Sequence, residues 1–133
     1  EPRVVAILDW ELSTIGHPLA DLGFCCIPWV TSPDEYGGLL GLDIAALGIP
    51  SLDAFVAGYM DEAGDMPPLE PFHVAFALFR FAVIFVGIAD RALAGTAAGA
   101  NAAALAPLAQ RFAVRALQVI GQDGGPVLSR RGG

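Results

Sequence analysis

The chain has 133 residues, of which 55% are hydrophobic and 16% are charged, and its net charge is −7. A chain of this length supports one domain that buries roughly two thirds of the surface its unfolded form exposes, and the low charged fraction, against about a quarter in typical domains, indicates that part of the apolar surface meets a partner. The acidic balance and the absence of lysine argue against nucleic-acid binding through a basic surface.

The first expected element is a short strand over residues 3–8. These residues are mostly β-branched or apolar, and Asp9 follows them directly. This pattern is typical of a buried strand that delivers a carboxylate to its exposed end. No second strand is expected in the chain, so the edge would be unpaired, and we expect the protein to self-associate through it and through its apolar helices.

Four helices are expected after the strand, which makes the fold mainly α. Pro18 fits the first turn of a helix, where its missing N–H is not needed. Ser51 and Asp53 are typical of a helix start, and Gly64 of a helix end. Residues 31–47 are rich in glycine and turn-forming residues, which predicts an irregular connection. The expected helices cover residues 18–29, 51–64, 69–93 and 105–120.

The third of these helices is expected to be the central buried helix. Its apolar side chains cover nearly the whole circumference, so each face should pack against other parts of the protein. Arg80 and Asp90 interrupt the apolar run, which argues against a helix that spans a membrane. The side chains expected to be buried include Phe72, Phe76, Phe79, Val83 and Val86.

The last helix has one apolar face, and it closes a domain expected over residues 1–121. Before it, the Ala/Gly-rich residues 95–104 offer almost nothing to pack, which predicts a mobile loop. After it, residues 122–133 are expected to form a disordered tail. The apolar face consists of Leu108, Phe112, Ala116 and Val119.

Nothing in the sequence indicates export. No basic segment followed by an apolar run and a small-residue cleavage site opens the chain. Cys25 and Cys26 are adjacent, a spacing that suits neither a disulfide framework nor a zinc site, so both are expected to be small core residues. We therefore expect a cytoplasmic protein.

Two acids near the start belong to a specific motif. The apolar run ends on Asp9, and Asp21 follows twelve residues later. The surrounding residues strongly resemble the metal-binding segment of aminoglycoside-phosphotransferase-like small-molecule kinases, especially the branch linked to acyl-CoA dehydrogenases. The motif is Ile7-Leu8-Asp9-Trp10-Glu11-Leu12-Ser13 with Gly16-His17-Pro18-Leu19-Ala20-Asp21-Leu22, and the likeness continues more loosely through Gly48-Ile49-Pro50, the helix around Tyr59, Phe79-Arg80 and residues 91–95.

The resemblance implies a kinase-like C-lobe. In the family, a His-Gly-Asp catalytic loop and an ATP-binding N-lobe precede this segment. The chain has no His-Gly-Asp, no lysine and no glycine-rich loop between two strand signals. We therefore expect the C-terminal portion of such a kinase, with no catalytic base of its own and no activity alone.

The resemblance also implies roles for three acids. Kinases hold Mg²⁺ with an Asp placed just after a strand, and Asp9 matches this position. Glu11 lies two residues further on and is either a second contact to the metal or its water shell, or a solvated loop acid. Asp21 would brace the catalytic loop from the first turn of a helix, partly buried and accepting backbone N–H groups.

Five further residues have competing interpretations. Trp10 is expected to pack beneath the loop rather than to stack on substrate, His17 to be a turn or cap residue, and His73 a satisfied core or edge residue. A charge in so apolar a helix needs a partner or a cleft. Arg80 and Arg91 are therefore either paired with acids or bind an anionic substrate or a coenzyme A phosphate.

The expected function of the intact parent is phosphoryl transfer. The resemblance implies transfer of the γ-phosphoryl of ATP or GTP, with Mg²⁺, to a hydroxyl of a small molecule. Aminoglycosides and hydroxyacyl-CoA esters are both compatible acceptors, and the dehydrogenase-linked branch favours the second. The alternative is a helical binding or interaction module that has kept the kinase fold and lost catalysis.

Overall fold

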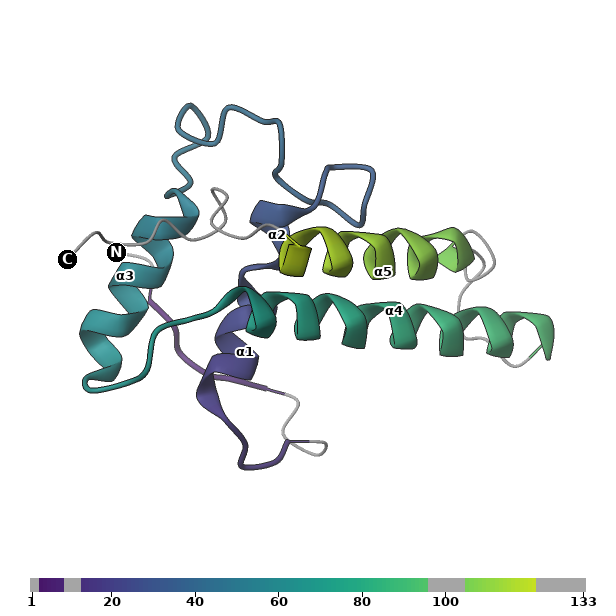
Figure 1. The fold of residues 1–133 in the computed structure, drawn as a ribbon, viewed down its shortest axis with the longest axis horizontal. Coiled ribbons are helices and arrows are strands. Elements are labelled where there is room, and N and C mark those ends of the chain that lie inside the picture. Colours follow the sequence, from purple (N-terminus) through teal and green to yellow (C-terminus); the bar gives the residue numbers. More distant parts are fainter. Residues whose placement is uncertain (1–2, 9–12, 96–104, 122–133) are drawn as a thin grey trace.

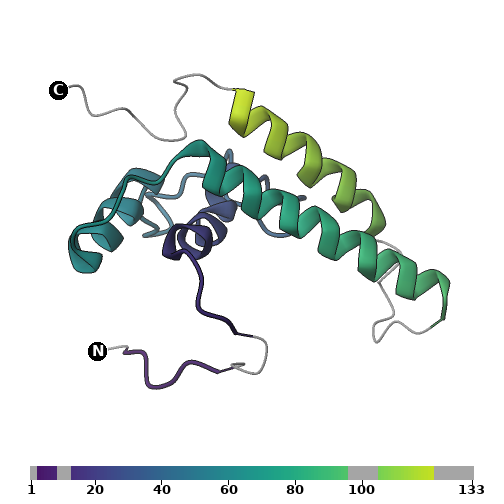
Figure 2. The same ribbon diagram turned by 60° about the horizontal axis from the view of Figure 1, so that its bottom comes forward.

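The computed structural model describes residues 3–8, 13–95 and 105–121, and these ranges contain five helices. Figures 1 and 2 show a long antiparallel pair formed by the last two helices, with the first helix packed near the start of the fourth. The expected mainly α fold is confirmed. The helices are α1 (Pro18–Cys25), α2 (Ile27–Val30), α3 (Leu52–Ala63), α4 (Pro71–Leu93) and α5 (Ala106–Gly121).

The helix expected over residues 18–29 is divided in two at Cys26. Pro28 has no N–H to give to the carbonyl of Phe24, and its ring would clash with that carbonyl in a continuous helix. The chain therefore ends α1 at Cys25 and begins α2 with Pro28 in its first turn, where proline is tolerated. Pro18 occupies the same position in α1, as expected.

Helix α3 has the expected ends. The Ser51 hydroxyl accepts a hydrogen bond from the backbone N–H of Ala54 at 3.2 Å, which satisfies one donor of the first turn. Gly64 ends the helix with φ +80°, a conformation that glycine adopts without strain. The indole N–H of Trp29 donates to the carbonyl of Pro50 at 2.9 Å, and its ring stacks on Phe55, so α2 holds the start of α3.

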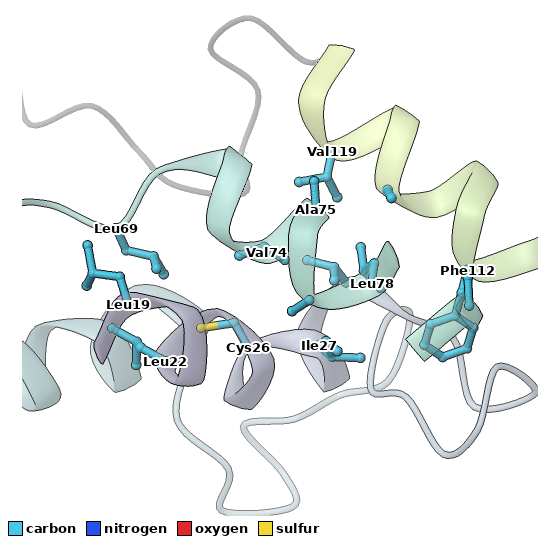
Figure 3. Close-up of a cluster of buried hydrophobic side chains, with 14 of the residues drawn as sticks. Leu19, Leu22, Cys26, Ile27, Leu69, Val74, Ala75, Leu78, Phe112 and Val119 are labelled. Atoms are coloured by element: carbon cyan, nitrogen blue, oxygen red, sulfur yellow. The ribbon is translucent and has the colours of Figure 1, made fainter. Parts of the chain in front are cut away.

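The hydrophobic core lies where α1, α2, α4 and α5 meet (Figure 3). The face of α5 expected from its periodicity is buried in full. Gly23 lies at the crossing of α1 and α4, where a Cβ would come within 2.6 Å of the carbonyl oxygen of His73. The core residues labelled in Figure 3 are Leu19, Leu22, Cys26, Ile27, Leu69, Val74, Ala75, Leu78, Phe112 and Val119.

Residues 3–8 do not form the expected strand. They have no regular secondary structure and are exposed, Val4 and Val5 most of all at 83%. A strand is stabilised by the backbone of a neighbouring strand, and the described part of the chain contains no other strand. The apolar pattern therefore identified residues that favour a strand, but the pairing that would form one is not present in this structure.

Helix α4 is not buried on all sides, contrary to expectation. One face enters the core through Val74, Leu78 and Phe85. The opposite face is exposed because α1 and α5 cover only part of the circumference. The five side chains named above as expected core, Phe72, Phe76, Phe79, Val83 and Val86, all lie on this exposed face.

Helix α4 is also long and apolar enough, by length and composition alone, to cross a membrane. Its mean hydropathy reaches 2.1 over eighteen residues, a third of which are buried in the structure. The core helix of a water-soluble protein passes the same test, so this is weak evidence for a span. Arg80 and Asp90 therefore do not by themselves exclude α4 as a membrane-spanning helix, contrary to expectation.

The two cysteines have different environments, so the shared expectation holds for only one of them. Cys26 is fully buried. Its burial, and to a lesser extent the charge of the neighbouring Cys25, raises the pKa of its thiol to about 12. Cys25 is exposed, although partial burial and the nearby Asp21 carboxylate also raise its pKa. Cys26 is thus the core residue of the pair.

Candidate functional site

The motif that predicts the metal site falls partly outside the described residues. Asp9, Trp10 and Glu11 all lie within residues 9–12, which the structure does not describe. The segment after them, residues 13–17, is exposed and leads directly into α1. The structure therefore describes only the residues that follow Asp9 and Glu11. The role of these two acids as metal ligands stays a prediction from sequence.

Asp21 lies in the first turn of α1, as expected, but it is exposed rather than partly buried. Leu19 and Leu22 occupy the buried side of the same helix. Among the described residues no N–H donates a hydrogen bond to the Asp21 carboxylate. Asp21 lies on a face of α1 that the described structure leaves exposed, and its burial against a catalytic loop stays a prediction for the intact protein.

The two histidines of the chain lie beside each other at the start of α1 and α4. His17 is the N-cap residue of α1, which agrees with the expected cap role, and its ring stacks on that of His73 with centroids 5.9 Å apart. His73 Nδ1 accepts the backbone N–H of Glu70 at 3.0 Å, within a reciprocal cap at the start of α4. His73 is thus a satisfied edge residue, as expected.

Arg80 and Arg91 both lie exposed on α4. The guanidinium of Arg80 lies over the ring of Phe24, 5.7 Å from its centroid, a cation–π contact that was not among the expected partners. Among the described residues Arg80 has no acidic partner. The guanidinium of Arg91 turns back toward Gly87 on its own helix. Among the described residues no ion pair joins Arg80 to Asp21.

Sequence reasoning missed a cluster of ion pairs between the connection after α2 and helix α5. Arg111 donates to the Asp34 carboxylate at 2.6 Å and to the Asp34 carbonyl oxygen at 3.2 Å. Arg115 donates to the Glu35 carboxylate at 2.7 Å. The partners are nearly eighty residues apart along the chain, so no local spacing indicated them; the acidic pair beside Ser32-Pro33 and the i, i+4 arginines were the only signals.

These contacts shift the pKa of both acids. Hydrogen bonds from Ser32 and then Arg111 lower the pKa of Asp34 to about 2. Burial raises the pKa of Glu35, but hydrogen bonds from the Ser32 backbone, Arg115 and the Ser32 hydroxyl outweigh it and lower the pKa overall. The cluster stabilises the charged forms and holds the irregular connection against α5.

Within the described ranges, no three His, Cys, Asp or Glu side chains are grouped so that they could hold a metal ion. Carboxylates are the hard oxygen ligands that Mg²⁺ prefers, and Asp9 and Glu11 supply two of them within three residues of sequence. The donor chemistry of the motif therefore fits Mg²⁺.

Comparison with known proteins supports the family resemblance that the motif indicated. The model of the phosphotransferase enzyme family matches residues 1–72, which include Asp9, Glu11 and Asp21 and all of α3. The chain is 35% identical over 127 residues to mouse acyl-CoA dehydrogenase family member 10, covering 92% of this chain and 12% of that protein. It is 34% identical over 124 residues to human acyl-CoA dehydrogenase family member 11, covering 90% of this chain and 16% of that protein.

The likeness extends to plants. The chain is 34% identical over 109 residues to a probable acyl-CoA dehydrogenase, IBR3, of Arabidopsis thaliana, covering 77% of this chain and 13% of that protein. The chain thus spans between about an eighth and a sixth of the length of these relatives. No solved structure matches it. The resemblance inferred from the motif is confirmed: the chain belongs to the phosphotransferase enzyme family.

Proposed function

We propose that this chain forms part of a kinase that transfers the γ-phosphoryl group of ATP or GTP to a hydroxyl group of a small molecule. The observation that carries the proposal is the Asp9 to Asp21 motif, which lies within the 72 residues that match the phosphotransferase family. The whole protein would carry the activity, since the chain spans only a small part of its relatives.

In this proposal Asp9 is the metal ligand and Glu11 contacts the metal or its water shell. Mg²⁺, when bound, would neutralise the negative charge on the phosphates of the nucleotide. Asp21 would position the neighbouring catalytic loop from the first turn of α1, and its exposure in the described structure leaves its carboxylate open to that loop.

The acceptor that we propose is a hydroxyacyl-CoA ester. The relatives compared above are named as acyl-CoA dehydrogenase family members, and these names point to acyl-CoA esters as substrates. Arg91 is exposed on α4 and is a cationic side chain that would meet an anionic group such as a coenzyme A phosphate. An aminoglycoside is cationic, so the same side chain would repel it.

The metal role can be tested in the whole protein with Asp9→Asn and a matched control. Asp9→Asn keeps the shape of the side chain but removes the charge that binds Mg²⁺, so kcat should fall by orders of magnitude. Asp61→Asn makes the same chemical change on the exposed side of α3, at a residue outside the motif, and should leave kcat unchanged. Binding of Mn²⁺ in the presence of nucleotide, followed by electron paramagnetic resonance, should weaken only in Asp9→Asn.

A normal kcat for Asp9→Asn at ordinary Mg²⁺ would remove Asp9 from the metal site and contradict the proposal. Absence of turnover with every hydroxyl acceptor in the unaltered whole protein would favour the non-catalytic helical module instead. Comparison of hydroxyacyl-CoA esters with aminoglycosides as acceptors decides the substrate class. The 133-residue chain alone should show no turnover. Most of the rate enhancement in phosphoryl transfer comes from groups that position the reactants, and this chain lacks the His-Gly-Asp loop and the lysine that would do so.

A further inference from the structure

Helix α4 carries a second apolar face that the described structure leaves uncovered. Six large side chains on it are between 41% and 87% exposed. They point away from the core face of the same helix, which Val74, Leu78 and Phe85 form. We call this set the outer seam of α4. Its members are Phe72, Phe76, Phe79, Val83, Val86 and Leu93.

The spacing of the outer seam is that of a helix–helix contact. Its positions follow one another at alternating steps of four and three residues, from 72 through 76, 79, 83, 86 and 90 to 93. An average step of 3.5 residues keeps a narrow line of side chains facing one partner helix along its length. From Phe72 to Leu93 this line is about 32 Å long at 1.5 Å per residue. The pattern therefore favours a partner helix that lies along α4.

The charges near the outer seam are complementary to a second copy of the same helix. Asp90 occupies the one position of the repeat that is not apolar, and Arg80 lies beside the seam ten residues earlier, about 15 Å along the axis. When two copies of α4 run antiparallel with Val83 opposite Val86, Asp90 of one copy lies opposite Phe79 of the other, and Arg80, the next residue, lies within about 1.5 Å of the level of Asp90. Two-fold symmetry forms this pair twice.

We propose that the outer seam of α4 is a homodimer interface, with two α4 helices packed antiparallel and two reciprocal ion pairs between Arg80 and Asp90. Shifting the helices by one heptad would place Asp90 opposite Phe72, which is followed by His73 rather than by an arginine, so the carboxylate would be partly desolvated without Arg80 beside it. The ion pairs thus select the register, while the apolar side chains supply most of the affinity.

Two neighbouring substitutions test whether the seam is the interface. Val83 and Ile84 are adjacent on α4 and 53% and 48% exposed, but Ile84 lies about 100° further round the helix and outside the seam. Sedimentation of the 133-residue chain at tens of micromolar should show a dimer for the unaltered chain and for Ile84→Glu, and a monomer for Val83→Glu. Circular dichroism should show the same helix content for all three.

Charge exchange tests the register. Arg80→Asp places a second carboxylate against Asp90 at both ends of its homodimer, and Asp90→Arg places two guanidinium groups together at both ends, so each variant alone should dissociate more readily by about tenfold or more. An equimolar mixture restores opposite charges at both positions, and should form a heterodimer that native mass spectrometry resolves.

Three outcomes would overturn the proposal. They are a monomeric unaltered chain at these concentrations, a Val83→Glu chain that is still dimeric, and charge variants that dimerise equally well alone and mixed. A chain that is monomeric in solution but sediments with phospholipid vesicles would assign the seam to a membrane surface instead.

Discussion

Arg115 of α5 donates a 2.7 Å hydrogen bond to the carboxylate of Glu35, a residue eighty positions earlier in the chain. The Glu35 side chain is only 7% exposed, and Arg115 Nε is buried with no hydrogen-bond partner among the described residues. The charge of Arg115 is therefore balanced chiefly by Glu35. This pair, with Arg111 and Asp34 at its exposed side, fixes the connection after α2 onto α5.

Glu35→Gln should destabilise the chain by about 1–3 kcal/mol, because it leaves the half-buried Arg115 without a counter-charge while keeping the volume of the side chain. Urea denaturation followed by circular dichroism measures the loss. Asp34→Asn is the matched control: it removes a carboxylate whose pair with Arg111 is exposed to water, so its effect should be clearly smaller. Equal losses for the two variants would show that burial does not set the strength of this cluster.

The same cluster predicts a loss of stability in acid. The pKa of Asp34 is about 2 in the folded chain, below the value of about 3.9 for an unfolded aspartate. A lowered pKa means that its contribution is fully present above the unfolded value and is lost as the pH falls through the folded value. Between about pH 5 and 2 the free energy of unfolding should therefore fall, and fall less steeply in Asp34→Asn. Parallel pH curves for the two proteins would exclude a role for Asp34.

Gly23→Ala should destabilise the chain although alanine favours helices. Alanine normally stabilises a helix interior by about 0.5–1 kcal/mol relative to glycine. At Gly23 the new methyl group would lie 2.6 Å from the His73 carbonyl oxygen and push α1 away from α4. Gly58→Ala in α3, where no atom lies within 4 Å of the added Cβ, should show the normal stabilisation. The midpoint of thermal unfolding should therefore fall in Gly23→Ala and rise in Gly58→Ala. A Gly23→Ala chain that is more stable than the unaltered chain would show that α1 and α4 are not closely packed at Gly23.

Asp21→Ala separates a role in catalysis from a role in folding. Because Asp21 is exposed and accepts no hydrogen bond from the described residues, its removal should change the stability of the 133-residue chain by no more than about 0.5 kcal/mol. In the whole protein the same variant should lower kcat if Asp21 braces the catalytic loop. An unchanged kcat would leave Asp21 as an ordinary exposed acid of a helix start.

Local features of the structure could be predicted from the sequence because they depend on neighbours in the chain. Ser51 and Gly64 end α3 where their side-chain chemistry and backbone freedom indicated. The buried face of α5 follows from its 3.6-residue periodicity. The family was recognisable from the Asp9 to Asp21 motif for a similar reason: the spacing of its chemical groups is contained in one short segment.

Only the tertiary structure decided features that depend on distant residues. Helix α4 is apolar on nearly every side, so its sequence could not tell which face α1 and α5 would cover, and the expected core side chain Phe79 is exposed whereas Phe85 is buried. Residues 3–8 have the composition of a strand, but a strand forms only with a partner. The Arg115–Glu35 pair joins residues eighty positions apart, and such a contact exists only once packing has brought α5 beside the connection after α2.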